Sequence, residues 1–270
     1  MICTPRIFRG VFFNSTPHTM NYNELLDVAK EASQKASDAI IRIYETGDFS
    51  IEAKADDSPL TKADKASHNE IVALLEGTGL PILSEEGSKI PFDERKDWEY
   101  FWMIDPLDGT KEFIKKNGEF TVNIALIHKT KVVLGVVYTP VLKEMFWAID
   151  GQGAYKDGNK ISVNSFSTED ENLKVVASRS HLNDDTQAFL DNLNNPEIVS
   201  KGSSLKLLMV GEGQADLYPR YAPTMEWDTA AAQIIVEEAG GTVKIKDTND
   251  PVQYNKEDLL NPYFLVAGKH

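Results

Sequence analysis

The chain carries WEYFWMIDPLDGT at residues 98–110. The first half of this stretch is apolar and rich in aromatic residues, which is typical of a strand buried in a sheet. Asp105 and Asp108 follow, three residues apart, and Pro106 and Gly109 favour a turn. Paired carboxylates at the end of a buried strand are unfavourable unless protons or cations neutralise them. The stretch therefore predicts a site that takes up protons or cations.

Three further acidic residues weigh against the simplest alternative for this stretch, which is a surface turn capped by Asp. Glu85 follows a short apolar run, and Asp228 precedes an apolar helical run. Asp64 lies three residues after Thr61, which is the spacing of a capping box. Each acid also suits an ordinary role, in a solvated loop or in helix capping. Four such sites in one chain favour a hard cation, since Mg²⁺ binds few carboxylates together with substrate phosphate.

Gly109 and Thr110 supply the complementary feature. If residues 111–114 begin a helical turn, its free amides can hold a phosphate oxygen. Carboxylates that bind cations, beside amides that bind phosphate, predict metal-assisted hydrolysis of a phosphate ester.

Length and composition describe an ordinary globular protein with room for a large core. The 270 residues are 41% hydrophobic and 26% charged, with a formal net charge of −14. Such an acidic chain repels nucleic-acid polymers, although it can bind a small anion through metal ions. Its single cysteine, Cys3, excludes a disulfide framework and fits a reducing cytoplasm. No apolar run is long enough for a transmembrane helix.

Hydrophobic periodicity predicts helices first, then a β meander, then alternating strands and helices. The expected helices are 24–46, one that begins near 61 and ends before 77, 203–211 and 229–239. The expected strands are 81–84, 98–104, 120–128, 132–139, 144–149, 173–177, 215–218, 242–246 and 263–267. The meander indicates an antiparallel sheet, and the later alternation indicates an α/β half.

Longer motifs resemble a known family. They are Asp57-Ser-Pro-Leu-Thr61, LSEE at 83–86, DPLDGTKEFIKKNGEFTVNIAL at 105–126, LGVVYTPV at 134–141, SRSH at 178–181, GSSLK at 202–206, EGQADLYPR at 212–220 and Trp227-Asp228-Thr-Ala-Ala. Together they resemble the lithium-sensitive, magnesium-dependent phosphatase superfamily that includes inositol monophosphatase, and within it the 3′(2′),5′-bisphosphate nucleotidase branch. The resemblance runs from Asn21 to the end of the chain.

The resemblance implies the inositol monophosphatase fold, a layered α/β/α/β/α sandwich with an α+β and an α/β part. Residues 21–165 would form an α+β half that binds the metal ions, and residues 166–270 an α/β half that sets substrate specificity. Residues 1–20 lie outside the resemblance. We expect them to be a disordered extension, or to precede the true start of the protein at Met20.

The same resemblance implies two or three Mg²⁺ ions. Glu85, Asp105 and the carbonyl oxygen of Leu107 would bind the first ion. Asp105, Asp108 and Asp228 would bind the second, so that Asp105 bridges the two. The second ion would stabilise negative charge on the leaving ribose oxygen.

Asp64 and Thr110 would be the catalytic pair that orients and deprotonates the attacking water. Asp64 would also reach a third, looser ion near Glu85 through water. The amides of Gly109 and Thr110 would hold the phosphate.

Specificity for a nucleotide is implied for residues of the C-terminal half. Ser203, Lys206 and Arg220 would contact the nucleotide and its 5′-phosphate, Lys as a point charge and Arg as a bidentate fork. The alternative is that Lys206 is an ordinary lysine on a helix surface and Arg220 an ordinary arginine in a loop. His181 would touch the adenine or ribose, and a plain loop histidine is an equal alternative. The implied substrate contacts are Glu85, Leu107, Asp108, Gly109, Thr110, His181, Ser203, Lys206, Arg220 and Asp228.

The activity implied is hydrolysis of adenosine 3′,5′-bisphosphate to AMP and phosphate in sulfur assimilation, with 3′-phosphoadenylyl sulfate as a second substrate and Li⁺ as an inhibitor. The alternative is an inositol-1-phosphate or other sugar-phosphate phosphatase. A third hypothesis is a protein that binds the nucleotide without hydrolysing it. It is disfavoured because every residue that the resemblance implies as a metal ligand is present in the sequence. The protein would be cytoplasmic, either free or peripheral on the cytoplasmic face of the inner membrane, and a monomer or homodimer.

Overall fold

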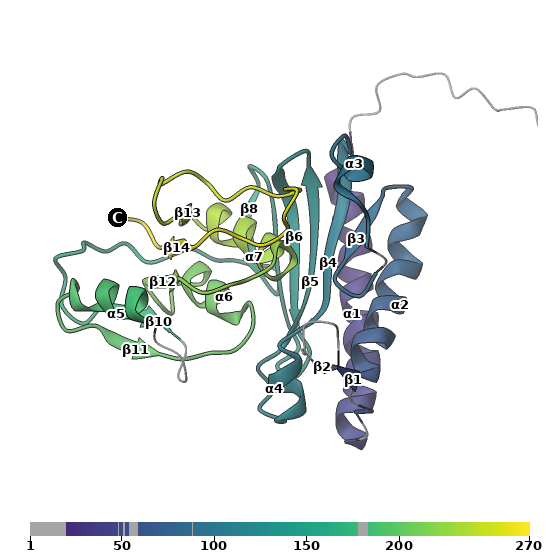
Figure 1. The fold of residues 1–270 in the computed structure, drawn as a ribbon, viewed down its shortest axis with the longest axis horizontal. Coiled ribbons are helices and arrows are strands. Elements are labelled where there is room, and N and C mark those ends of the chain that lie inside the picture. The colour runs from purple at the N-terminus through teal and green to yellow at the C-terminus, as the bar shows by residue number, and fades with distance from the viewer. Residues whose placement is uncertain (1–19, 48, 51, 54–58, 88, 178–182) are drawn as a thin grey trace, which may run out of the picture.

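The computed structural model describes residues 20–47, 49–50, 52–53, 59–87, 89–177 and 183–270. These residues form two large sheets and three helical layers, stacked in the order α/β/α/β/α (Figure 1). The predicted layered sandwich is thereby confirmed. The prediction for residues 1–20 falls almost wholly outside the described part of the chain.

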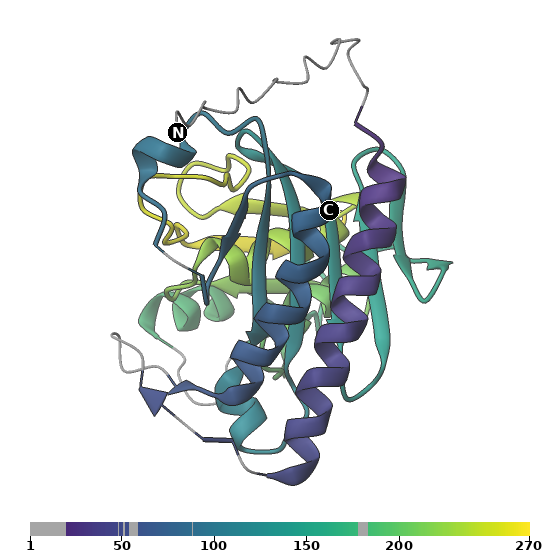
Figure 2. The same ribbon diagram turned by 90° about the vertical axis from the view of Figure 1, so that its right-hand side faces the viewer.

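Five helices build the helical layers. They are α1 (Tyr22–Thr46) and α2 (Lys62–Leu75) on the outer face of the first sheet, α6 (Leu205–Gly211) and α7 (Glu226–Glu238) between the sheets, and α5 (Asp184–Asp191) on the far face of the second sheet. Helices α1 and α2 lie side by side (Figure 2). The Asn21 side chain caps α1 by accepting from the amides of Asn23 and Glu24, and Gly47 ends it with a φ of 72°. The predicted end at Thr46 is confirmed, and the helix begins two residues before the predicted start at Glu24.

The first sheet has seven strands in the order β3-β4-β5-β6-β7-β8-β9. They are β3 (Ile82–Ser84), β4 (Tyr100–Asp108), β5 (Thr121–His128), β6 (Lys131–Thr139), β7 (Glu144–Ile149), β8 (Gly153–Lys156) and β9 (Asn159–Lys160). Neighbours from β4 to β9 pair antiparallel, as the predicted meander requires, whereas β3 runs parallel to β4.

Strand β4 divides its side chains between two cores. Trp102 and Ile104 pack with α1 and α2, whereas Phe101 and Met103 pack with α6 and α7. This alternation follows from the two-residue period of a strand. Asp105 is the next residue in the second series, so its carboxyl group points toward the layer that contains α7.

The second sheet has five strands in the order β11-β10-β12-β14-β13, with mixed directions. They are β10 (Lys174–Val176), β11 (Glu197–Val199), β12 (Leu217–Arg220), β13 (Thr242–Ile245) and β14 (Phe264–Ala267); the short elements elsewhere are β1 (Glu52–Ala53), β2 (Pro59–Leu60), α3 (Phe92–Arg95) and α4 (Thr110–Ile114). The predicted boundary at residues 165 and 166 lies between the two sheets. Because one core contains side chains from both parts, the division into two halves stays a prediction.

Helix α7 packs unusually close to β6, and Gly135 makes this possible. A Cβ atom at Gly135 would lie 2.3 Å from the carbonyl oxygen of Ala231 and 2.7 Å from the Ile234 side chain. Neither the helix backbone nor the sheet can move without disturbing the core between them. Gly135 therefore sets the distance of α7, and with it the position of residues at the start of that helix.

Replacement of Gly135 by alanine is expected to destabilise the protein by about 1–3 kcal/mol, because the added methyl overpacks the contact between α7 and β6. Urea unfolding followed by circular dichroism measures the change. The control is Gly77→Ala, since a Cβ at Gly77 meets nothing within 4 Å. Equal stability of the two variants would contradict the role assigned to Gly135.

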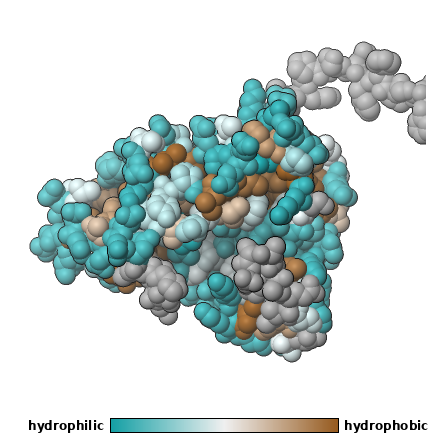
Figure 3. All heavy atoms as spheres, viewed as in Figure 1, coloured by the Kyte–Doolittle hydropathy of each residue, from teal (hydrophilic) through white to brown (hydrophobic). Residues whose placement is uncertain are grey.

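Hydrophilic residues cover most of the face seen in Figure 3, and apolar residues gather in a band near its centre. Within the described residues, every helix is too short or too polar to cross a membrane. The predicted peripheral membrane contact and the predicted monomer or homodimer stay predictions.

Candidate active site: a carboxylate cluster beside a cationic cavity

Asp105 and Asp108 lie within β4, so the prediction that the strand ends before them is wrong. Asp105 pairs with Asn123 of β5, and Asp108 pairs with Thr121. Three steps along β4 therefore oppose two along β5, which is the count of a β-bulge. Pro106 occupies the irregular part, where its missing N–H costs no ladder hydrogen bond. The bulge keeps both carboxylates attached to a rigid sheet.

The structure brings together three of the predicted metal ligands. Asp105, Asp108 and Asp228 each offer a carboxylate oxygen, and these oxygens lie within 4.8 Å of one another. Glu85 follows β3, whose parallel pairing places Ser84 opposite Ile104, so Glu85 lies beside Asp105. The four carboxyl groups come from three distant parts of the chain. Their geometry fits a site for hard divalent cations, and the individual ligand roles stay predictions.

The electrostatics of this cluster favour a bound cation. Burial, followed by the charges of Glu85, Asp108 and Asp228, raises the pKa of Asp105 well above its usual value. Burial and the charge of Asp108 raise the pKa of Asp228 to about 8. Like charges in a poorly solvated site must take up protons or bind cations. The arrangement is thus unfavourable as it stands and suited to metal ions.

Asp228 is the third residue of α7. It does not occupy the N-cap position, which was the simpler explanation for an acidic residue at this place. Met225 occupies the N-cap position, and its amide donates to Asp228 Oδ2 over 2.9 Å. Asp64 has the same place in α2, where the Thr61 amide donates to Asp64 Oδ2 over 2.8 Å, as the capping-box spacing predicts. In both residues one oxygen fixes the side chain to the helix start.

Thr110 and Asp64, the predicted catalytic pair, are in contact. The Thr110 hydroxyl donates to Asp64 Oδ1 over 3.1 Å and lies 3.4 Å from the carbonyl oxygen of Leu107. Asp64 is only 1% exposed, although it is a carboxylate. Gly109 precedes Thr110 with a φ of 95°, and a Cβ there would lie 3.0 Å from the carbonyl oxygen of Glu119. Only glycine fits this close turn into α4.

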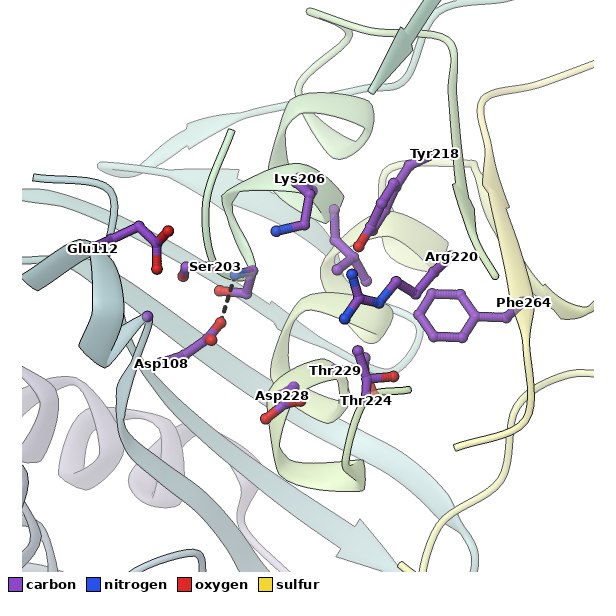
Figure 4. Close-up of a pocket in the computed structure, with 13 residues that line it drawn as sticks. Asp108, Glu112, Ser203, Lys206, Tyr218, Arg220, Thr224, Asp228, Thr229 and Phe264 are labelled. Carbon is purple, nitrogen blue, oxygen red and sulfur yellow. Dashed lines mark hydrogen bonds between the residues drawn. The ribbon is translucent and has the colours of Figure 1, made fainter. Parts of the chain in front are cut away.

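A cavity of about 110 Å³ adjoins the carboxylate cluster. Lys206 and Arg220 point into it from one side, and Asp108 and Asp228 from the other (Figure 4). Arg220 Nη2 donates to the carbonyl oxygen of Pro223 over 2.7 Å, while its buried Nε has no partner among the described residues. Burial lowers the pKa of Lys206 to about 8. Two poorly solvated cations suit an anionic group of a ligand.

Ser203 and His181 are two of the predicted nucleotide contacts. Ser203 lines the same cavity but precedes α6, because its φ of 55° is incompatible with the helix start predicted there. His181 lies outside the described residues. Asp57 of the motif near Thr61 also lies outside them.

Sequence reasoning missed three polar residues that surround Asp108. The Ser204 amide donates to Asp108 Oδ2 over 2.6 Å, and the Ser204 hydroxyl donates to Asn123 Oδ1 over 3.0 Å. Thr121 donates to the same oxygen over 3.1 Å. The signal available in the sequence was the alternation of β5, which puts Thr121 and Asn123 on the same face as Asp105.

The five-layer fold, the clustered carboxylates and the neighbouring cavity lined by Lys206 and Arg220 are features expected of a metal-dependent phosphatase. Residues 21–268 match the inositol monophosphatase family, and the chain belongs to that family. It is 43% identical over 246 residues to the 3′(2′),5′-bisphosphate nucleotidase CysQ of Salmonella typhimurium, and 42% identical over 247 residues to that of Escherichia coli K12. Each alignment spans 90% of this chain and 99% of the relative.

Solved structures of inositol monophosphatase family members are also similar to this chain. The crystal structure of CysQ from Bacteroides thetaiotaomicron, a bacterial member of the inositol monophosphatase family, aligns with a TM-score of 0.80 and 44% identity, covering 92% of this chain and 98% of that one. Inositol monophosphatase from Anabaena aligns with a TM-score of 0.74 and 28% identity, covering 93% and 92%.

Proposed function

We propose that this protein is a Mg²⁺-dependent 3′(2′),5′-bisphosphate nucleotidase, which hydrolyses the 3′-phosphate of adenosine 3′,5′-bisphosphate to give AMP and phosphate. It would also convert 3′-phosphoadenylyl sulfate to adenylyl sulfate, and would act in the cytoplasm in sulfur assimilation. The observation that carries the proposal is the cavity with Lys206 and Arg220, which shares Asp108 and Asp228 with the carboxylate cluster. One substrate can thus present a reacting phosphate to the cluster and a second phosphate to the cavity.

The metal-binding residues would be divided between two ions. Glu85, Asp105 and the carbonyl oxygen of Leu107 would hold one, and Asp105, Asp108 and Asp228 the other, with a third near Glu85. Bound Mg²⁺ would polarise the phosphate and neutralise charge that develops on the leaving 3′-oxygen. The protein holds its ligands on a bulged strand and a helix start, so little reorganisation precedes the reaction.

Asp64 and Thr110 would prepare the attacking water. The Thr110 hydroxyl already donates its proton to Asp64 Oδ1, so the lone pairs on Thr110 Oγ1 can accept a hydrogen bond from water. As the water oxygen bonds to phosphorus and the bond from phosphorus to the 3′-oxygen breaks, one water proton would pass to Thr110 Oγ1 while Thr110 gives its own proton to Asp64. The released 3′-oxygen would take up a proton from solvent water. The amides of Gly109 and Thr110, at the start of α4, would hold a phosphate oxygen.

Lys206 and Arg220 would bind the 5′-phosphate, with Ser203 at the edge of the cavity. Arg220 Nε has no partner among the described residues, and the planar guanidinium group offers a fork that suits phosphate geometry. An inositol phosphate with one phosphate group would leave these two half-buried cations without a phosphate partner. The cavity therefore favours the bisphosphate over the alternative substrate.

A substrate panel tests the proposal. Phosphate release is measured for adenosine 3′,5′-bisphosphate, adenosine 3′-phosphate and inositol 1-phosphate, with and without Mg²⁺ and with added Li⁺. We expect the highest kcat/KM for the bisphosphate, absolute dependence on a divalent cation, and inhibition by Li⁺. Faster turnover of inositol 1-phosphate would favour the alternative function instead.

Added Mg²⁺ is expected to raise Tm, and to raise it more at pH 8 than at pH 5.5. The folded pKa of Asp228, about 8, exceeds the value of about 3.9 for an unfolded Asp. Without metal, the stability linked to this group is therefore fully present below pH 4 and is lost as pH rises toward 8. At high pH, bound Mg²⁺ neutralises the carboxylates in place of protons. At 100 times its Kd, Mg²⁺ should raise the free energy of unfolding by about 2.7 kcal/mol, which corresponds to a rise in Tm of about 5 °C.

Differential scanning fluorimetry in EDTA and in MgCl₂ across this pH range measures the effect, with NaCl of equal ionic strength as the control. An equal Mg²⁺ increment at both pH values would contradict the assignment of these carboxylates as ligands.

A further inference from the structure

Thr121 joins the two parts of the candidate active site through its hydroxyl group. It is completely buried at the first position of β5. Its Oγ1 lies 2.7 Å from the hydroxyl oxygens of both Ser203 and Ser204, and 3.1 Å from Asn123 Oδ1. Strand β5 belongs to the sheet that carries Asp105 and Asp108, whereas the two serines precede α6.

The segment before α6 is attached to this end of the sheet at several points. The Gly202 amide donates to Glu119 Oε2 over 2.9 Å, and the Ser204 amide donates to Asp108 Oδ2 over 2.6 Å. A Cβ at Gly202 would lie 2.8 Å from the Glu112 side chain, so the contact is also close. The segment therefore takes its position from the first sheet.

Ser203 needs such support because of its backbone. Its φ of 55° lies in the left-handed region, which is unfavourable for a residue that has a Cβ atom. Its hydroxyl group lies 2.7 Å from the Thr121 hydroxyl and also hydrogen-bonds the Asp108 carboxylate. Ser203 lines the cavity with Lys206 and Arg220, so the contact with Thr121 orients one wall of the proposed second-phosphate site.

The hydroxyl protons can rearrange when an anion binds. Thr121 has one proton, which it can give to Asn123 Oδ1, to Ser203 Oγ or to Ser204 Oγ. If Ser203 donates to a phosphate oxygen, Thr121 can turn its proton to Ser203 Oγ. The Ser204 hydroxyl then keeps Asn123 Oδ1 satisfied. The cluster can thus supply a donor to the cavity without leaving a buried oxygen unpaired.

We propose that Thr121 is a positioning residue that sets specificity for a substrate with a second phosphate, by holding Ser203 toward the cavity. This inference rests on the proposed function, because it assigns the cavity to the 5′-phosphate. Thr121 itself touches neither the reacting phosphate nor the metal ions. Its loss should therefore act on KM for the bisphosphate and leave kcat nearly unchanged.

The test compares Thr121→Val with Thr121→Ser on two substrates that differ only in the 5′-phosphate. Valine keeps the shape but removes the hydroxyl, and serine keeps the hydroxyl. For T121V we expect KM for adenosine 3′,5′-bisphosphate to rise about tenfold, the equivalent of one hydrogen bond to a charged group. Its kcat, and its kcat/KM for adenosine 3′-phosphate, should stay within about twofold of wild type. T121S should behave as wild type.

Two further variants test whether the effect of T121V acts through Ser203. Ser203→Ala should raise KM for the bisphosphate by itself and add nothing to T121V, since the two residues act as one unit. Thr139→Val removes a buried hydroxyl near the end of β6, where Thr139 accepts from the Glu144 amide, and should leave both substrates unaffected. Tm of each variant shows that it is folded.

The outcomes separate this inference from the proposed function. Wild-type protein that hydrolyses adenosine 3′-phosphate as efficiently as the bisphosphate would overturn both. Wild-type preference for the bisphosphate that survives unchanged in T121V, or equal losses on the two substrates, would overturn the role of Thr121 and leave the proposed function intact.

Discussion

Asparagine in place of Asp105 is expected to lower kcat for adenosine 3′,5′-bisphosphate by more than about 10³-fold, while the metal-free protein becomes more stable. Asp105 is 1% exposed and lies against Glu85, Asp108 and Asp228. If it bridges two ions, an amide would weaken both sites and remove several kcal/mol of charge stabilisation. Without metal, the same change removes a carboxyl group that must either take up a proton or stay charged beside three others, so stability at pH 8 should rise by about 1–2 kcal/mol.

Phosphate release in saturating Mg²⁺ and urea unfolding in EDTA measure the two effects. Asp216→Asn is the matched control, because Asp216 is another nearly buried Asp but accepts from the Lys174 amide and from Asn164 Nδ2. That variant should lose stability and keep its activity. Near-normal hydrolysis by D105N, or a loss of stability without metal, would show that Asp105 has a structural role and binds no ion.

The ordinary and the functional explanations of the acidic residues turned out to be compatible. Capping was the simple explanation for Asp64, and it is correct, because one carboxylate oxygen accepts the Thr61 amide. The other oxygen accepts the Thr110 hydroxyl. Asp228 likewise accepts the Met225 amide and still contributes an oxygen to the cluster. A capping role for an acidic residue is therefore no argument against a role in the site, because one carboxylate can serve both.

Local pattern predicted most elements because they depend on local causes. The meander follows from short apolar runs separated by turn residues, and α1 from the helical spacing of its apolar residues. The end of β4 was misplaced because the bulge depends on pairing with β5, which no local pattern reports. Helix α5 and strand β11 were missed, since both are short and largely exposed. Asn183 before Asp184 and Asp185 was the available signal for α5.

The site depended on long-range packing that periodicity cannot supply. Spacing predicted single acids at element ends, and only the resemblance predicted that they meet. The structure gives a physical reason for that meeting: β4 alternates toward α7, and Gly135 lets α7 lie close to β6. Thr121 and Asn123 escaped notice because both are common strand residues, and only the neighbouring segment at 202–204 makes them important.

Methionine in place of Lys206 is expected to lower kcat/KM for adenosine 3′,5′-bisphosphate by about 10²-fold and to leave adenosine 3′-phosphate nearly unaffected. Lys206 shares the cavity with Arg220, and its removal should forfeit a charge-assisted hydrogen bond of about 2–3 kcal/mol to the 5′-phosphate. Methionine retains the length of the side chain, and burial already disfavours the charged lysine. The variant should therefore fold at least as well as wild type.

Steady-state kinetics on the two substrates measures the difference, and Lys201→Met serves as the control. Lys201 lies on the same segment, but its exposed side chain pairs with Glu119 at 3.6 Å and does not line the cavity. Its loss should change neither substrate, since exposed ion pairs contribute little. Equal losses on both substrates in K206M would mean that Lys206 acts on the reacting phosphate through Asp108. Loss for the bisphosphate alone would support a cavity that distinguishes nucleotide bisphosphates from other phosphate esters by the charge of Lys206.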